Sequence, residues 1–596
     1  YVFRSLDTVA IHFGGRGEDI GFHAHQTGSV TYHSDAINDV SSLDFQKVSQ
    51  LAYEHLERDR AAYVIINPIP ESEVDKTAET SSYHGASEGD AVINASDALA
   101  EVTEEDVISA YVKPDLGALV DKRLANGMRV VILPHGESPL AQATLLLGGG
   151  NDVGEVGMHN LAGRFAADDW YDGRSGNDPL QIAAERTGAQ WGSSRFAADS
   201  YAYHNASGVR VPASNLDGAL WMMREGVETL RPDFNGKGTW AKKQVESMGK
   251  NFHSRAWHIS DMSQRHLYPD SPHDWPLQWD TVQNYVDISP SDAKAYQHRI
   301  VQPKNATLVI VGNVDKDETL RLVVDYFGGW ENPADVELGP VTVPEPPAMA
   351  EGSKVLVFDN PKRTQTQVSY ECRLHTEGVQ DIQATSVLSN LVFDRTFSQL
   401  RVKEGLAYSP GGFASASPNG TAQLTFSSLA VNSGVGRTLE FFRDFTQKIE
   451  DGGIDDEVLT RYKLRRARSH GVQAQSTSQM TGKLVSVLRW GQPWSMLTDA
   501  GEDIASVDAA TLQRMVNGCN SRAIATLEGP ADVITPQLEE RGIAYEVVDY
   551  KARGDELHEK FDPKGYKKYA KKRAKDEKKN KDTDEAETTD GSADSE

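Results

Sequence analysis

The chain has little cysteine and no long apolar run. Among its 596 residues only Cys372 and Cys519 are cysteines, too few for a disulfide framework or a cysteine-rich zinc module. Two cysteines fit either redox compartment. No apolar run approaches the roughly 18 residues that a membrane span needs, so we expect no spanning segment. The sequence begins at Tyr1 without a methionine or a signal-peptide pattern, and we expect a processed or partial polypeptide.

Positive charge is also scarce. The chain carries 61 basic residues against 87 acidic ones, a formal net charge of −26. Nucleic acids and anionic membrane surfaces bind positively charged faces, so this balance argues against either as the main partner. Hydrophobic residues make up 39% of the chain and charged residues 25%, which permits a sizeable core and excludes wholesale disorder.

Internal repeats organise the chain. Residues 35–44 and 499–508 share aspartates and a serine in register, and each copy leads through a helical stretch into an apolar strand, at 62–68 and 523–530. A third copy begins with the helix start Ser289-Pro290-Ser291-Asp292 and leads to the apolar strand 306–312. A period of roughly 200–250 residues is too long for a solenoid and indicates duplicated α/β units.

Segments poor in apolar residues separate these units. Further strands are predicted at 129–134, which opens the first full unit, and at 366–370, where apolar and polar residues alternate. The sequence therefore predicts the end of a preceding unit (1–70), a linker (71–115), a full unit (116–335), a proline-rich linker (336–352), a second full unit (353–550) and a charged, disordered tail (551–596).

One nine-residue motif resembles a known family. Residues 400–408 read Leu-Arg-Val-Lys-Glu-Gly-Leu-Ala-Tyr, which resembles the Leu-Arg-x-Lys-Glu-x-Leu-x-Tyr signature of the pitrilysin/insulinase zinc metallopeptidases, the clan with an inverted zinc motif. Three more stretches resemble this family in the same order, at 124–131, 148–161 and 305–315. The resemblance covers roughly residues 1–550.

The resemblance implies an α+β fold. It implies duplicated α/β sandwich units, each a mixed, mostly antiparallel sheet covered by helices. Two full units and the end of a preceding one would form half of a clamshell that closes around a peptide. By this resemblance residues 116–335 hold a degenerate zinc motif and residues 353–550 hold an Arg/Tyr substrate-contact motif.

The zinc motif of the family is absent from its expected place. The family's His-x-x-Glu-His lies on a helix, with two histidines as ligands and a glutamate that activates water. Here Asn160, Gly163 and Arg164 take the positions of the first histidine, the glutamate and the second histidine. A guanidinium does not deprotonate and cannot ligate zinc, and no carboxylate remains as the base. His159 is one residue out of register, and we interpret it as structural.

No other histidine group replaces this motif. The spacings within two histidine sets do not place two ligands on one helix face with a carboxylate, and we interpret them as surface or core residues: His253, His258, His266 and His273, and His23, His25 and His33. We therefore expect no metal and no cofactor in this chain, and zinc in a partner half. A self-sufficient enzyme with an unrecognised metal site stays open as a third alternative.

Arg401 and Tyr408 are the candidate site residues. Residues 388–403 are predicted as a helix that Gly405 can stop, with Arg401 in its last turn and Tyr408 on the loop or strand that follows. The resemblance implies that both reach across the chamber to the substrate backbone, where a tyrosine hydroxyl can stabilise a developing oxyanion. The alternative is that Arg401 only pairs with a neighbouring acid such as Glu404 while Tyr408 packs.

Two functions follow from these observations. The leading hypothesis is the non-catalytic half or subunit of a zinc metalloendopeptidase that degrades peptides in an enclosed chamber. Its partners would be a catalytic half or subunit carrying His-x-x-Glu-His and a peptide substrate, and it would not be catalytic alone. The alternative is a catalytically dead pseudo-peptidase that acts as a structural or peptide-binding scaffold. By fold analogy we favour a periplasmic or otherwise extracytoplasmic bacterial location.

Overall fold

The structure is a computed structural model of the chain. It describes residues 24–26, 28–29, 44–55, 102–136, 138–148, 183, 186–191, 199–200, 204–229, 249–269, 295, 298–334, 348–377, 381–417 and 420–575. Within these residues no helix combines the length and the apolar character needed to cross a membrane.

The first sheet has seven strands. They run in the order β1-β2-β7-β3-β6-β4, with β5 also paired to β6. Their bounds are β1 Val120–Arg123, β2 Arg129–Pro134, β3 Leu140–Gly148, β4 Gln190–Trp191, β5 Asp199–Ser200, β6 His204–Pro212 and β7 Ala306–Gly312. Strands β2 and β7 are parallel, whereas β1–β2, β7–β3 and β3–β6 are antiparallel.

The second sheet has six strands in the order β10-β11-β9-β12-β8-β13. Their bounds are β8 Lys354–Asp359, β9 Gln365–Leu374, β10 Gly411–Ala416, β11 Ala422–Val431, β12 Ile524–Gly529 and β13 Glu546–Val547. Strands β12 and β8 are parallel, as are β13 and β8, and the remaining pairs are antiparallel.

The two sheets repeat one topology. In each, the opening strand (β2 or β8) lies parallel to the closing strand (β7 or β12), which is antiparallel to the second strand (β3 or β9), followed by β6 or β11. The predicted α+β fold of duplicated units with mixed, mostly antiparallel sheets is confirmed. The strands predicted at 129–134, 306–312, 366–370 and 523–530 are present as β2, β7, β9 and β12. The strand predicted at 62–68 lies outside the described residues, and the domain limits stay predictions.

The described residues also form helices, several of which cover the two sheets. Their bounds are α4 Phe45–His55, α5 Glu104–Ala110, α8 Leu216–Thr229, α10 Arg255–Leu267, α13 Lys316–Phe327, α14 Asp381–Phe397, α15 Val435–Glu450, α16 Asp456–Gln473, α17 Thr477–Arg489, α18 Ser495–Thr498, α19 Ala500–Ala505, α20 Ala509–Val516, α21 Cys519–Arg522, α22 Ala531–Glu540 and α23 Tyr550–Phe561. Short 3-10 turns and one π-helix complete the set: η3 Ala213–Asn215, η4 Pro303–Asn305, η5 Ser398–Lys403 and η6 Asn432–Gly434. Side-chain caps begin several of these helices, as Ser254 does for α10 and Ser476 for α17.

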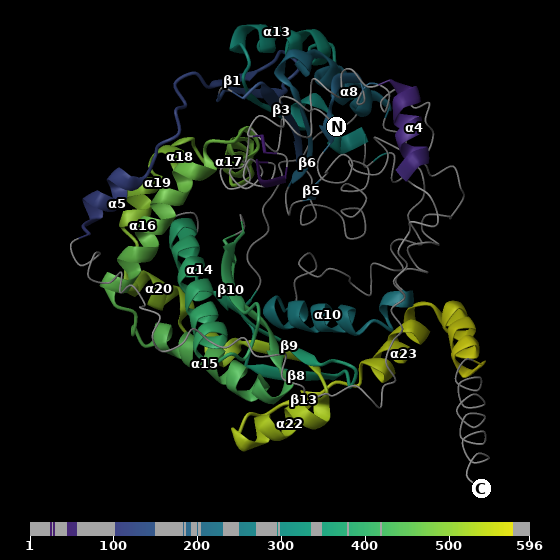
Figure 1. Cartoon of the computed structure of the whole chain (residues 1–596), viewed down its shortest axis with the longest axis vertical. Coiled ribbons are helices and arrows are strands. Elements are labelled where there is room, and N and C mark those ends of the chain that lie inside the picture. Colours follow the sequence, from purple (N-terminus) through teal and green to yellow (C-terminus); the bar gives the residue numbers. More distant parts are fainter. Residues whose placement is uncertain are drawn as a thin grey trace.

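One helix from the part of the chain that forms each sheet packs on the other sheet. Helix α17 follows the second sheet's long helices in sequence, yet Met480 and Leu484 on it pack with Val131 of β2 in the first sheet. Helix α10 lies between β6 and β7 in sequence, yet its Leu267 packs with Phe358 of β8 in the second sheet. Figure 1 shows α10 beside β8 and β9, and α17 near the first sheet. Both faces of each sheet are therefore covered.

The two cysteines are bonded to each other. Cys372 on β9 and Cys519 at the start of α21 form a disulfide, with their Cα atoms 5.5 Å apart. Both side chains are fully buried in the core between the second sheet and helices α14, α15 and α20. The bond therefore joins a central strand to a segment 147 residues later in the chain.

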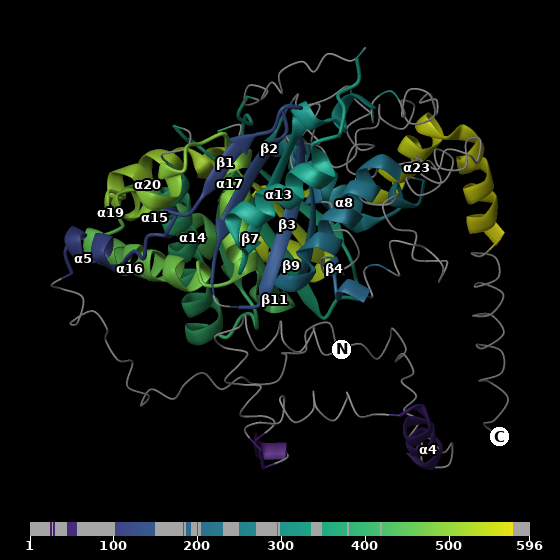
Figure 2. The same cartoon turned by 90° about the horizontal axis from the view of Figure 1, so that it is seen from above.

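The C-terminal region differs from the prediction. Residues 550–575, most of them assigned from the sequence to a disordered tail, are mainly helical, beginning with α23. His558 of α23 hydrogen-bonds His253 at 2.9 Å, and Tyr569, in the helical residues that follow α23, stacks on His253 with ring centroids 3.8 Å apart. Figures 1 and 2 place α23 on the opposite side of the molecule from α16. Histidine and aromatic contacts, which a charge count does not reveal, hold these described residues against the rest of the chain.

Candidate functional site

The degenerate zinc motif lies outside the described residues. This applies to Asn160, Gly163 and Arg164 as well as to His159. Their donor set, an amide, a glycine and a guanidinium, does not fit zinc. The described part of the chain also holds no group of three or more histidine, cysteine or acidic side chains that could bind a metal ion.

Two histidines of the 253–273 set have structural contacts. His258 is fully buried and its Nε2 bonds the carbonyl oxygen of Phe252 at 2.8 Å. The Nε2 atom of His266 bonds the carbonyl oxygen of Arg522 at 2.9 Å. Burial lowers the pKa of both imidazoles. These contacts agree with the structural interpretation of the two residues.

The segment with Arg401 and Tyr408 changes its helical form before it turns. Helix α14 passes directly into the π-helix η5, which contains Arg401. Gly405 then takes a positive φ of 65°, which favours glycine because it lacks a Cβ atom. The amide of Leu406 donates to the carbonyl of Leu400 at 2.8 Å. The predicted helix and its end at Gly405 are confirmed, and single π-turns of this kind are frequent at functional sites.

The loop after Gly405 is also fixed to the sheet. Ala407 forms an isolated antiparallel bridge with Ala430 of β11, and the carbonyl of Leu406 accepts from the amide of Val431 at 2.9 Å. The backbone on either side of the turn is therefore held by α14 and by β11. Tyr408 directly follows Ala407, so its backbone position is set by the bridge to β11.

Arg401 and Tyr408 lie directly against each other. The Nη1 atom of Arg401 donates to the carbonyl oxygen of Tyr408 at 2.7 Å. The guanidinium lies 4.3 Å from the centre of the Tyr408 ring and 5.1 Å from that of Phe397. Tyr408 is 67% exposed, so it is not a core residue. Cation–π contacts with two rings fix the position of the Arg401 guanidinium. The Tyr408 side chain remains at the surface.

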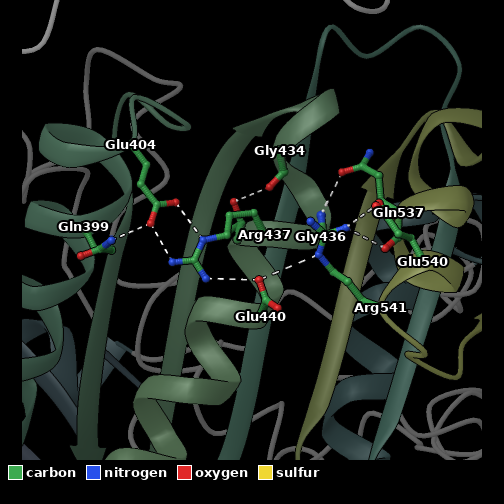
Figure 3. A network of polar contacts seen from close by, with 10 residues as sticks. Gln399, Glu404, Gly434, Gly436, Arg437, Glu440, Gln537, Glu540 and Arg541 are labelled. Carbon is green, nitrogen blue, oxygen red and sulfur yellow. Dashed lines mark hydrogen bonds and ion pairs between the residues drawn. The ribbon is translucent and has the colours of Figure 1, made fainter.

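Glu404, the acid considered as a partner of Arg401, is bound elsewhere. Both of its carboxylate oxygens accept from Arg437 on α15, at 2.7 and 3.1 Å, and one accepts from Gln399 at 2.6 Å. Arg437 also forms an ion pair with Glu440 at 3.2 Å. The carboxylate of Glu440 in turn lies 3.9 Å from the guanidinium of Arg541. Figure 3 shows this chain of contacts, the Glu404–Arg541 network, which runs from η5 across α15 to the residue after α22.

The network keeps Glu404 ionised. Burial alone would raise the pKa of Glu404, but the hydrogen bonds from Arg437 and Gln399 outweigh it and hold the pKa below its ordinary value. A bidentate arginine–carboxylate pair has a defined geometry. It fixes the turn between Arg401 and Tyr408 to helix α15.

Replacing Glu404 by glutamine tests this support. We expect Glu404→Gln to lower the free energy of unfolding at pH 7 by about 1 kcal/mol, because a partly exposed charge-assisted pair is lost. The folded-state pKa of Glu404 is depressed, so the wild-type advantage is present above the unfolded value, about 4.5, and disappears as the pH falls through the folded value. Melting temperatures measured between pH 7 and pH 3 check this.

A matched control is available on the same network. Glu440 is more exposed than Glu404, with side-chain exposures of 42% and 20%, so Glu440→Gln should have a smaller effect. Equal losses in the two variants, or a loss at Glu404 that persists at pH 3, would contradict a stabilising role for the Glu404–Arg437 pair.

Two residues of this region were missed from the sequence. Phe397 lies four residues before Arg401 near the helix end, and an aromatic residue at that spacing is a signal that could have identified it. Arg437 lies 33 residues after Glu404, and no local pattern indicates that pair.

Comparisons with known proteins agree with the motif. Residues 287–465, which include Arg401 and Tyr408, match the family model described as the peptidase M16 inactive domain. The matched segment makes up less than half of the chain. The resemblance to the pitrilysin/insulinase metallopeptidases, and to a zinc-less half among them, is thereby confirmed. No curated protein matches the sequence.

Several solved structures share the fold. A protease from Helicobacter pylori aligns with a TM-score of 0.58 at 16% identity, covering 70% of this chain and 100% of that one. A peptidase M16 inactive domain from Pseudomonas fluorescens gives 0.55 at 16% identity, with coverages of 69% and 98%. The periplasmic protease PqqL from Escherichia coli gives 0.56 at 16% identity, and the match covers 75% of this chain and 50% of PqqL.

Proposed function

We propose that this chain is the non-catalytic half or subunit of a zinc metalloendopeptidase. It binds peptides in an enclosed chamber and supplies Arg401 and Tyr408 to the substrate, while a partner or an upstream segment carrying His-x-x-Glu-His supplies zinc. The match of residues 287–465 to an M16 inactive domain supports the non-catalytic part. Because the donor set at positions 160, 163 and 164 does not fit zinc, no step of hydrolysis is assigned to a metal in this chain.

The geometry of the Arg–Tyr pair carries the proposal. Among the described residues the hydroxyl of Tyr408 has no hydrogen-bond partner, and the side chain is 67% exposed. The ring is positioned by Arg401. A preorganised, exposed donor can stabilise a developing oxyanion without rearrangement, which gives this hydroxyl its proposed role.

An edge strand gives the peptide a place to bind. Strand β10 follows Tyr408 directly and lies at the edge of the described second sheet. Phe413 on this strand is 51% exposed. An extended peptide that adds to such an edge gains main-chain hydrogen bonds that depend little on its sequence. We therefore place the peptide along β10.

The buried disulfide supports an oxidising location. Disulfides persist in secreted and periplasmic proteins and are rare in the cytosol. The neighbour PqqL is described as periplasmic. A periplasmic or otherwise extracytoplasmic bacterial location therefore belongs to the proposal.

Reconstitution tests whether this chain binds the peptide while the catalytic half cleaves it. We expect the purified chain alone to cleave no quenched fluorescent peptide, with or without added zinc, but to bind it. Addition of the catalytic half should start cleavage. Cleavage by the chain alone in zinc would contradict the proposal. Binding without any gain of cleavage by the assembled complex would favour the scaffold alternative.

A further inference from the structure

A cavity lies where helices of the two halves meet. It is bounded by α14, α16, α17 and α18, and its volume is about 370 Å³. Helix α17 packs on the first sheet, whereas α14 and α16 pack on the second. Part of the wall is apolar, formed by Ile382, Val487, Met496 and Leu497. The polar side chains on the wall include Arg466, His470 and Lys483.

These three side chains present hydrogen-bond donors. The Nζ atom of Lys483 lies 2.9 Å from Nδ1 of His470. Because a protonated lysine only donates, Nδ1 accepts and the hydrogen of the neutral imidazole lies on Nε2. His470 is only 5% exposed, and its Nε2 has no hydrogen-bond partner among the described residues. A buried donor of this kind costs free energy unless a ligand or water satisfies it.

Arg466 adds a second cation. Its Nε atom donates to Gln383 at 3.3 Å, which is a neutral partner. Among the described residues no carboxylate forms an ion pair with Arg466 or Lys483. The charged groups that perturb these side chains belong to the cluster itself. Besides burial, Arg466 and Lys483 lower the pKa of His470, and Arg466 lowers the pKa of Lys483. The acids Asp499, Glu502 and Asp503 act instead on Tyr111, whose ring tilts against His470 at 5.0 Å.

The electrostatics agree with this arrangement. Burial, followed by the charge of Arg466, lowers the pKa of Lys483 to about 8. Burial, followed by Arg466 and Lys483, lowers the pKa of His470 to about 3. Two cations that share a low-dielectric cavity without an acid are unfavourable together. A bound negative charge would relieve both.

We propose that this cavity binds a small oxyanion, the phosphate or carboxylate group of a ligand, between Lys483, Arg466 and the Nε2–H of His470. The volume accommodates such a group together with a short apolar portion against Ile382 and Val487. The site is separate from the Arg401–Tyr408 pair and goes beyond the proposed peptidase role. Because the cavity walls come from helices that pack on different sheets, the bound anion contacts both sheet-and-helix units of this chain.

Binding of two probe anions to the full chain tests the site. We expect inorganic phosphate or acetate to bind at pH 7, measured by isothermal titration calorimetry at constant ionic strength. Lys483→Met should weaken the affinity at least tenfold. Lys448→Met, an exposed lysine on α15, should leave it unchanged within twofold. Phosphate binding alone identifies a phosphoryl ligand, and acetate binding alone identifies a carboxylate; either result supports the site.

A second variant keeps the test decisive if Lys483→Met does not fold. Ser486 lies three residues after Lys483 on α17 and also lines the cavity, so Ser486→Asp places a carboxylate beside the cations. We expect this variant to lose anion binding and to melt at a higher temperature. Absence of binding of both anions to the wild type overturns the proposal. So does equally tight binding to Lys483→Met or to Ser486→Asp.

Discussion

Tyr408→Phe is expected to lower kcat of the assembled peptidase by about 10²–10³-fold, the usual cost of removing one oxyanion donor. Phenylalanine retains the ring on which Arg401 lies at 4.3 Å and removes only the exposed hydroxyl. KM should change little, because the lost hydrogen bond strengthens in the transition state rather than in the bound substrate. Steady-state kinetics on the complex with its catalytic half provide the measurement.

The control for this variant is another exposed tyrosine. Tyr53 on α4 is 84% exposed, and Tyr53→Phe should leave kcat and KM unchanged. A change below threefold in kcat for Tyr408→Phe would remove the hydroxyl from the reaction. A rise in KM at unchanged kcat would show that Tyr408 only binds the peptide, and native mass spectra of both complexes would verify equal assembly.

Loss of the disulfide has the largest expected effect on stability. A cross-link between residues 147 apart reduces the entropy of the unfolded chain by an amount equivalent to about 5 kcal/mol in the loop-closure description. The double substitution Cys372→Ala with Cys519→Ala should lower the free energy of unfolding of the second unit by about this amount. Thermal unfolding by calorimetry should show its transition at a clearly lower temperature.

Reduction of the wild type separates the bond from the side-chain change. Both sulfur atoms are fully buried, so dithiothreitol should reduce them only when the unit opens. Wild-type protein that is unfolded, reduced and refolded should match the double variant to within about 1 kcal/mol per lost methylene-sized group. A double variant as stable as the oxidised wild type would show that the bond contributes nothing.

The sequence identifies strands better than it identifies their neighbours. Strands β2 and β7 were predicted at their observed residues because short continuous apolar runs rich in β-branched residues, such as 130–133, are typical of buried strands. The exchange of α10 and α17 between the sheets was not predictable. An amphipathic pattern shows that a helix has a buried face, but not which sheet covers it.

At the candidate site, too, the local sequence indicates single residues but not their tertiary partners. The nine-residue motif identified Arg401 and Tyr408, and the helix end at Gly405 followed from its positive φ preference. The pairing of Glu404 with Arg437, and the grouping of Lys483 with Arg466, depend on segments that only the tertiary structure brings together. The helical region after residue 550 was missed because its anchor, His253, lies about 300 residues earlier.

A native mass spectrum of the particle from its source, with zinc counted, tests the central claim most directly. We expect this chain of about 65.4 kDa to be bound to a second chain or segment that carries His-x-x-Glu-His, with one zinc ion per pair. A lone species that holds one zinc ion would contradict it, because the residues at positions 160, 163 and 164 cannot bind that metal. A lone species without zinc would contradict the two-part peptidase and favour a scaffold.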